Sequence, residues 1–133
     1  MLPSRSSIRR TSIIAASALL FVGLVAASAP FHLHLVQSLP AANATLGSVP
    51  DSIRLWFSQR AELAVTSVKV TGPGDSTVRL APLARGDSTI VIAPVKGKGS
   101  VTGGSYTVAW RTMAKDGHVV RGTFSFSVQP ATR

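Results

Sequence analysis

The residues best suited to chemistry in this sequence are three histidines and one aspartate. Asp116 and His118 are two positions apart, and alternate residues of an extended segment point to the same side. A carboxylate oxygen and an imidazole nitrogen can therefore be presented together, and His32 can complete the set if the first strand runs past this loop. Imidazole nitrogens with one carboxylate suit zinc, copper(II), iron or nickel, and a near-planar arrangement of nitrogen and oxygen favours copper(II).

A turn without any metal explains the same residues. An Asp two positions before a His in a β-turn commonly caps backbone amides. His32 and His34, in the segment FHLHL, can equally be residues at the exit of an export signal. These residues by themselves predict a candidate metal site and leave its occupant open.

The lack of cysteine excludes several other chemistries. The 133 residues contain no Cys, which rules out disulfides, cysteine-ligated zinc, iron–sulfur clusters and a cysteine nucleophile. A chain of this length supports one compact domain. Its formal net charge of +9 would ordinarily suggest nucleic acid or an anionic surface as partner. The cations are scattered, however, and no run of aromatic residues interleaves with them, so no nucleic-acid partner is expected.

The first part of the chain has the layout of an export signal. Residues 13–29 carry no charge. The segment before them contains three basic residues, Arg5, Arg9 and Arg10, and no acidic residue. The apolar run ends on the small residues Ala27–Ala29, which is typical of a signal-peptidase exit. Cleavage after Ala27 or Ser28 is equally open, because Pro30 directly follows the last small residue.

The apolar run is also long enough to serve as a membrane anchor. At about 1.5 Å per residue, an apolar helix over residues 11–29 approaches the thickness of a bilayer core. We therefore predict a signal peptide or retained anchor over residues 1–29 and one domain over residues 30–133. In both cases that domain is expected outside the cytoplasm, in the periplasm or another extracytoplasmic location.

After residue 30 the pattern is that of an all-β protein. Short apolar segments recur about every ten residues between turn residues, which is typical of sandwiches and barrels. The expected strands cover residues 33–37, 52–58, 65–70, 78–80, 89–93, 105–111 and 123–128. The pair Asp116-Gly117 predicts a hairpin turn between the last two. About seven strands suffice for two antiparallel sheets packed face to face.

Several segments together resemble the CopC-type (CopC/YobA-like) family of periplasmic copper-binding and copper-resistance domains. They are His32-Leu33-His34-Leu35 with Ser38-Leu39-Pro40-Ala41-Ala42-Asn43, the strand Ile53 to Ser58, the strand Gly104 to Arg111, and Asp116-Gly117-His118 with Gly122 to Phe126. Their order and spacing carry the resemblance, which spans residues 32–128. It implies a Greek-key, immunoglobulin- or cupredoxin-like sandwich that binds copper(II).

The resemblance also implies a ligand set. In the family, the amino-terminal histidine binds copper(II) through its imidazole and its free amine, and an Asp-x-His pair completes the site. Carried over, the ligands are His32, Asp116 and His118, with His34 expected beside them as a residue whose hydrogen bond orients the ligating groups.

The start of the mature chain decides which chelate can form. A chain beginning at His32 has the family's chelate, one beginning at Pro30 can form an alternative of the x-x-His type, and the full-length chain keeps a site of side chains only. Gln59 stands where some members have Glu after Phe-Ser. Only Met1 and Met113 occur, so the methionine-rich copper(I) site of some relatives is not expected.

The leading functional prediction is a periplasmic copper(II)-binding protein and not an enzyme. It would serve copper tolerance, sequestration or delivery to a membrane transport partner, such as a CopD-like inner-membrane protein, and it would take no small-molecule substrate. The alternative is an exported β-sandwich without metal, acting as an accessory module of a membrane protein. A third reading is an oxidative copper enzyme, for which the domain leaves little substrate surface.

Overall fold

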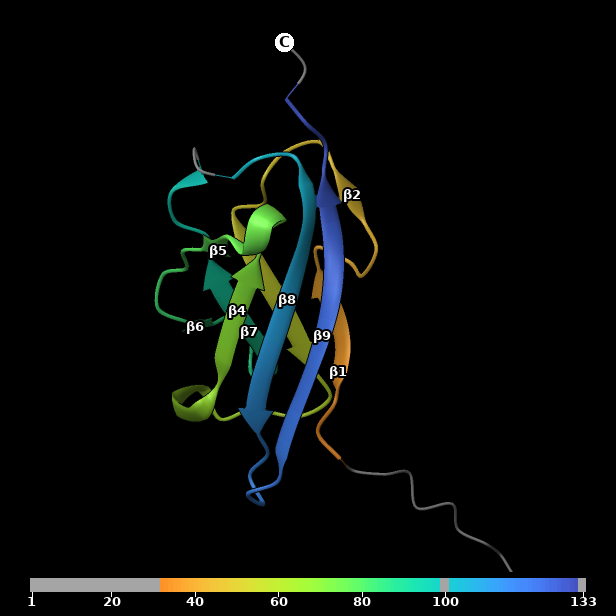
Figure 1. The fold of residues 1–133 in the computed structure, drawn as a ribbon. Helices are drawn as coiled ribbons and strands as arrows, with labels where there is room; N and C mark the ends of the chain where they lie inside the picture. Colours follow the sequence, from red (N-terminus) through yellow and green to blue (C-terminus); the bar gives the residue numbers. More distant parts are fainter. Residues whose placement is uncertain (1–31, 99–100, 132–133) are drawn as a thin grey trace, which may run out of the picture.

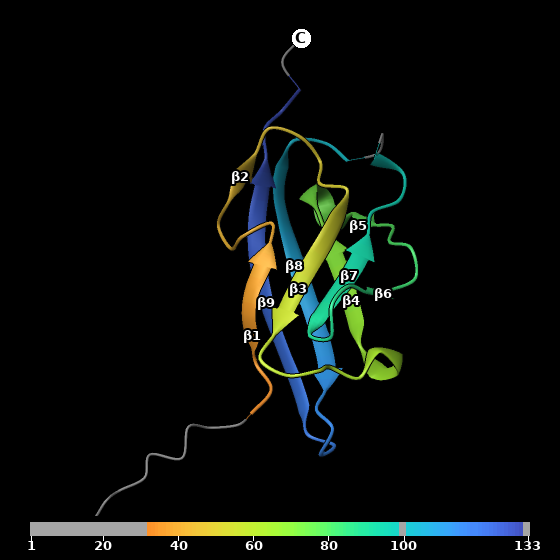
Figure 2. The same cartoon turned by 180° about the vertical axis from the view of Figure 1, so that it is seen from behind.

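The computed structural model describes residues 32–98 and 101–131, which form two β-sheets packed face to face (Figures 1 and 2). The four-stranded sheet contains, in spatial order, β1 (Leu35–Leu39), β3 (Ser52–Phe57), β7 (Ile90–Pro94) and β6 (Ala84–Arg85). The five-stranded sheet contains β2 (Thr45–Leu46), β9 (Val119–Val128), β8 (Gly104–Met113), β4 (Ser67–Thr71) and β5 (Thr77–Val78). The expected all-β sandwich is confirmed.

The structure adds detail that the sequence pattern did not contain. Three of the strands, β2, β5 and β6, have two residues each, and β2 and β6 were not predicted because two residues are too few for an alternating pattern to be recognised. The pair β2–β9 is parallel, so the five-stranded sheet is mixed and not purely antiparallel. Residues 63–65 form the short 3-10 helix η1 (Leu63–Val65), and a second one, η2 (Pro73–Asp75), lies in the β4–β5 turn.

The core lies between the two sheets and follows the predicted alternation. Ile53, Leu55 and Phe57 of β3 are almost completely buried, and Val108 and Trp110 of β8 face them. The Phe57 and Trp110 rings meet edge to face, with their centroids 5.3 Å apart. These inward positions anchor the strands whose outward positions and loops carry the candidate functional residues.

Close packing across the last hairpin requires a glycine. Gly122 pairs with Trp110 across β8 and β9, and a Cβ at Gly122 would lie 2.6 Å from the indole ring. The ring therefore lies directly against the neighbouring strand. This contact holds together the hairpin whose loop carries Asp116 and His118.

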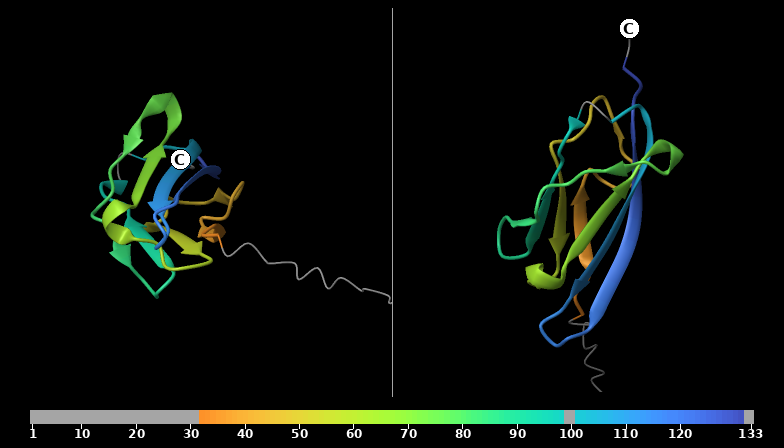
Figure 3. Two further views of the ribbon diagram at one scale, coloured as in Figure 1. Left: turned by 90° about the horizontal axis from the view of Figure 1, so that it is seen from below. Right: turned by 60° about the vertical axis from the view of Figure 1, so that its left-hand side comes forward.

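Strand pairing places the candidate site residues at one end of the sandwich. The start of β1 and the β8–β9 loop lie at the same end, opposite the carboxyl terminus (Figures 1 and 3). Residues 1–29, predicted as a signal or anchor, lie outside the described residues. Within residues 32–98 and 101–131, no helix has the length and hydropathy needed to cross a membrane.

Candidate metal centre

The β8–β9 loop brings Asp116 and His118 together as expected. The turn is closed by two backbone hydrogen bonds, from Ala114 to the His118 carbonyl at 2.9 Å and from Gly117 to the Ala114 carbonyl at 2.9 Å. Gly117 has φ 88, a left-handed conformation that glycine adopts without steric cost. The Asp116 Oδ2 to His118 Nδ1 distance is 2.8 Å, and Asp116 Oδ1 accepts a hydrogen bond of 3.0 Å from the His118 backbone amide.

This geometry selects one nitrogen of His118 for a metal. Because Nδ1 is hydrogen-bonded to the carboxylate, Nε2 is the ring nitrogen left available. A carboxylate on the far nitrogen also fixes the orientation of the ring. Both side chains are open to solvent, with 76% of His118 and 58% of Asp116 exposed. Asp116 therefore caps a backbone amide of the turn and orients the His118 imidazole at the same time. The turn-capping interpretation and the metal-site interpretation are thus compatible.

The hydrogen bonds from His118 also change the acidity of Asp116. Its pKa is lowered below the ordinary aspartate value, chiefly by the hydrogen bond from the His118 side chain and then by the one from the His118 backbone amide. The carboxylate form is therefore favoured to lower pH than in an isolated aspartate. A negative charge beside the imidazole favours binding of a cation at that nitrogen.

A serine organises the segment that carries the other two histidines. The Ser58 hydroxyl accepts a hydrogen bond of 3.0 Å from the His34 amide and donates one of 3.2 Å to the His32 carbonyl. The Ser58 amide in turn donates to the His34 carbonyl at 2.9 Å. Leu33, between the two histidines, is 3% exposed and anchors the segment in the core.

The sequence prediction assigned no role to Ser58. In the sequence, Ser58 is recognisable only as a polar residue that directly follows the alternating strand β3. Its contacts with residues 32–34 follow from the pairing of Leu35 with Phe57, which is a cross-strand register and not a local pattern.

His34 makes a hydrogen bond next to a predicted ligand. Its Nδ1 lies 2.9 Å from the His32 carbonyl oxygen, so the ring donates to the backbone of His32. This contact links the two histidines but reaches neither Asp116 nor His118.

The structure thus forms two pairs and not one assembled group. Asp116 contacts His118, and His34 contacts His32. Over residues 32–98 and 101–131, no group of three or more His, Cys, Asp or Glu side chains is arranged to hold a metal ion. The ligand set His32, Asp116 and His118 stays a prediction.

The chain is similar in sequence to a protein family and to individual proteins over most of its length. Residues 35–129 match the family model described as the CopC domain. The chain is 36% identical over 116 residues to Protein YobA of Escherichia coli (strain K12), covering 86% of this chain and 92% of that protein. It is 37% identical over 117 residues to Copper resistance protein C of Xanthomonas campestris pv. juglandis, covering 80% of this chain and 87% of that protein.

A solved structure extends the likeness to the fold. The crystal structure of PcoC, described as a methionine-rich copper resistance protein from Escherichia coli, matches with a TM-score of 0.65 at 27% identity. The match covers 74% of this chain and 99% of PcoC. This chain contains only two methionines, so the methionine-rich character named for PcoC is not shared.

Proposed function

The chain belongs to the CopC domain family, and from this membership we propose that it is a periplasmic copper(II)-binding protein. Its role is to hold copper for tolerance or sequestration, or to deliver it to a membrane transport partner. The observation that carries the proposal is the Asp116–His118 pair, in which the carboxylate holds Nδ1 and leaves Nε2 for the ion. The relatives named copper resistance proteins support the same role.

The donor types on this chain fit copper(II) better than copper(I). The proposed ligands are the imidazoles of His118 and His32, with Asp116 supplying an oxygen or holding the His118 ring. Imidazole and carboxylate suit copper(II), whereas copper(I) selects thiolates and thioethers. Apart from Met1, the one thioether is that of Met113, which is half-buried at the end of β8.

Because the start of β1 and the β8–β9 loop lie at one end of the sandwich, the two pairs could contribute to one site. We infer that His118 and the segment of His32 would hold the same copper ion, because the two pairs are carried at this common end of the sandwich (Figure 3). A chain that begins at His32 would add its terminal amine as a further nitrogen donor. We further propose that residues 1–29 direct export of the chain and that the transport partner is a CopD-like inner-membrane protein.

Calorimetric titration of the mature protein with Cu²⁺ tests the assignment. The parent protein is expected to bind one ion, and His118→Ala is expected to lose at least about tenfold in affinity, because a removed ligand is not replaced. Lys115→Ala is the matched control, since Lys115 is an exposed residue of the same loop without a proposed ligand role.

Two results would overturn the copper assignment. One is binding by His118→Ala that is as tight as in the parent. The other is a parent protein that takes up no Cu²⁺, which would favour the metal-free accessory module. Release of oxidised oligosaccharides from polysaccharide incubated with Cu²⁺, reductant and protein would instead support the oxidative enzyme.

A further inference from the structure

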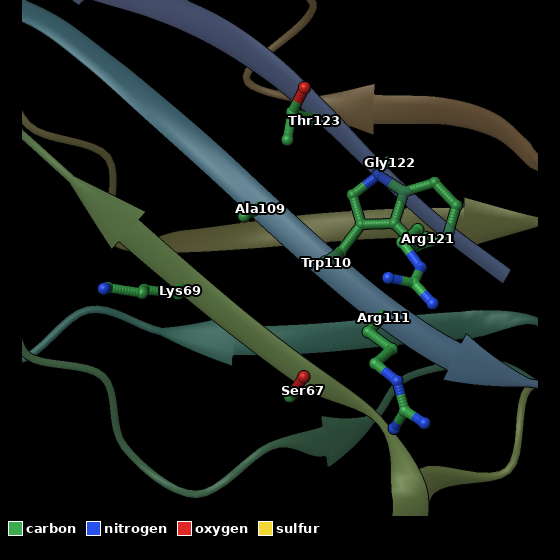
Figure 4. Close-up of a pocket in the computed structure, with 8 residues that line it drawn as sticks. All are labelled: Ser67, Lys69, Ala109, Trp110, Arg111, Arg121, Gly122 and Thr123. Carbon is green, nitrogen blue, oxygen red and sulfur yellow. The ribbon is translucent and has the colours of Figure 1, made fainter. Parts of the chain in front are cut away.

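Three cations that are far apart in the sequence gather on the outer surface of the five-stranded sheet. Strand alternation turns Lys69 of β4, Arg111 of β8 and Arg121 of β9 away from the core. Register places Arg111 opposite Arg121, and it places Lys69 opposite Ala109. We call this surface the cationic face and define it by Ser67, Lys69, Ala109, Arg111, Arg121 and Thr123 (Figure 4).

The charges of the cationic face are not balanced by the protein. Arg111 and Arg121 are directly opposed on neighbouring antiparallel strands, an arrangement in which like charges destabilise the sheet. In the described part of the chain, neither guanidinium nor the Lys69 ammonium forms an ion pair with a carboxylate. The outward positions of β4, β8 and β9 hold no acidic residue. Glu62, whose backbone contacts the end of β8, forms no ion pair with them within those same residues.

Small side chains leave a depression between these cations. Its volume is about 300 Å³, and the outward residues between the cations that line it, Ser67, Ala109 and Thr123, all have small side chains. In Figure 4, Arg111 and Arg121 extend to the same side of the depression and Lys69 extends to the other. Two neighbouring guanidinium groups present planar arrays of donors that match carboxylate oxygens.

We propose that the cationic face docks an acidic segment of a partner protein. Carboxylates along such a segment would neutralise the opposed arginines and remove their mutual repulsion. The outward residues around them are mostly Ser, Thr and Ala, which can donate hydrogen bonds to a peptide but offer little apolar surface to insert into a bilayer. Trp110, which lines the depression, is 8% exposed and packs against Phe57, so it is not a free stacking platform for nucleic-acid bases.

The cationic face lies close to the loop that carries Asp116 and His118, so a docked partner would lie close to this loop too. Only two residue pairs, Thr112–Val120 and Met113–Val119, separate the arginines from the loop of Asp116 and His118. At about 3.4 Å per residue, the three steps from Arg111 to Ala114 span about 10 Å, so a docked partner would lie roughly 10 Å from the start of that loop. The docking proposal itself does not require copper to bind.

Titration of the ¹⁵N-labelled mature protein with a hexaglutamate peptide tests the proposal by NMR. Saturable shifts are expected at residues 67–69, 109–111 and 121–123, and they should weaken as salt is raised. The double variant Arg111→Gln/Arg121→Gln is expected to lose about tenfold or more in affinity. The double variant Arg54→Gln/Arg79→Gln is the control, because it removes the same charge from exposed residues outside the cationic face.

Three outcomes would overturn the proposal. Equal weakening in the two double variants would mean that net charge alone attracts the peptide. Shifts centred on another surface would place the anion elsewhere. Tighter binding to phosphatidylglycerol vesicles than to hexaglutamate, lost in Arg111→Gln/Arg121→Gln, would assign the cationic face to a membrane surface instead.

Discussion

Asp116 accepts two hydrogen bonds from His118, one from the ring and one from the backbone amide, and both favour its ionised form. At the scale of single residues, this pair is therefore a preformed unit: an ionised carboxylate and an imidazole held in one orientation. A copper ion would meet an oriented nitrogen and not a freely rotating side chain, which lowers the entropic cost of binding.

The lowered pKa of Asp116 predicts a specific pH dependence. A carboxyl group whose pKa is lower in the folded state stabilises the fold above its unfolded pKa, and this contribution is lost as pH falls through the folded pKa. NMR titration of the Asp116 side-chain carboxyl carbon should give a midpoint below 3.8. In His118→Ala the midpoint should move upward, because the hydrogen bond from the His118 ring, which is the largest cause of the lowered pKa, is removed.

An Asp116 midpoint at or above 3.8 in the parent protein would contradict the hydrogen bond to the His118 ring.

The contribution of Ser58 to holding the segment of His32 and His34 can be tested by a single substitution. Replacing it by alanine removes the acceptor for the His34 amide and the donor to the His32 carbonyl. We expect Ser58→Ala to speed hydrogen exchange of the His34 amide and to lower the free energy of unfolding by about 1 kcal/mol. Ser58→Thr keeps the hydroxyl and should retain most of the protection of that amide.

Hydrogen exchange and urea unfolding measure these two effects. Unchanged exchange at His34 in Ser58→Ala would show that strand pairing alone holds the segment. If the proposed copper site includes His32, the same variant should also broaden the copper(II) paramagnetic resonance spectrum, because the ligand is held less uniformly.

At the scale of elements, the β8–β9 hairpin carries both proposed functions. Its loop presents Asp116 and His118, and its outward positions present Arg111 and Arg121. The hairpin is held by ten cross-strand residue pairs and by the packing of Trp110 on Gly122. Two long paired strands therefore support the proposed metal-binding loop and the cationic face as one unit.

The opposed arginines predict a conflict between stability and docking. Arg121→Glu places opposite charges across the strands, so the free energy of unfolding should rise by roughly 0.2–1 kcal/mol. The same change should abolish binding of hexaglutamate. Arg54→Glu, on the outer side of the four-stranded sheet, is the comparison for the change in net charge. Urea unfolding that shows Arg121→Glu to be less stable than the parent would mean that the arginine pair is not repulsive.

At the scale of the whole molecule, the residue at which the mature protein begins would decide which of the proposed copper chelates can form. Residues 1–29 are proposed to direct export, and the small residues before Pro30 favour cleavage over retention. We expect the mass of the protein recovered from the periplasm to correspond to a chain that begins between Ser28 and His32.

Each mass carries a different expectation for copper. A chain starting at His32 should bind copper with its terminal amine, so acetylation of that amine should weaken binding; a chain starting at Pro30 should use the x-x-His chelate. A full-length mass in the membrane fraction would contradict cleavage and identify an anchored protein whose site consists of side chains alone.

Patterns among neighbouring residues were enough to predict much of this protein. Alternation of Ile53, Leu55 and Phe57 identified a strand with one buried face, and Asp116-Gly117 identified the turn that closes the last hairpin. The spacing of Asp116 and His118 predicted that their side chains lie together, although the two residues lie in a turn and not in the extended segment from which this was argued. These predictions succeed because strand alternation, turn conformation and short-range contacts depend on residues that are adjacent in the chain.

Contacts between distant segments were decided only by the tertiary structure. Ser58 meets His32 and His34 because β1 and β3 pair in one register, and a shift of one residue would turn the partners to opposite faces. Arg111 and Arg121 are scattered charges in the sequence and become neighbours through strand register. Register depends on how two sheets bury their inner faces together, which is a property of the packed molecule and of no single segment.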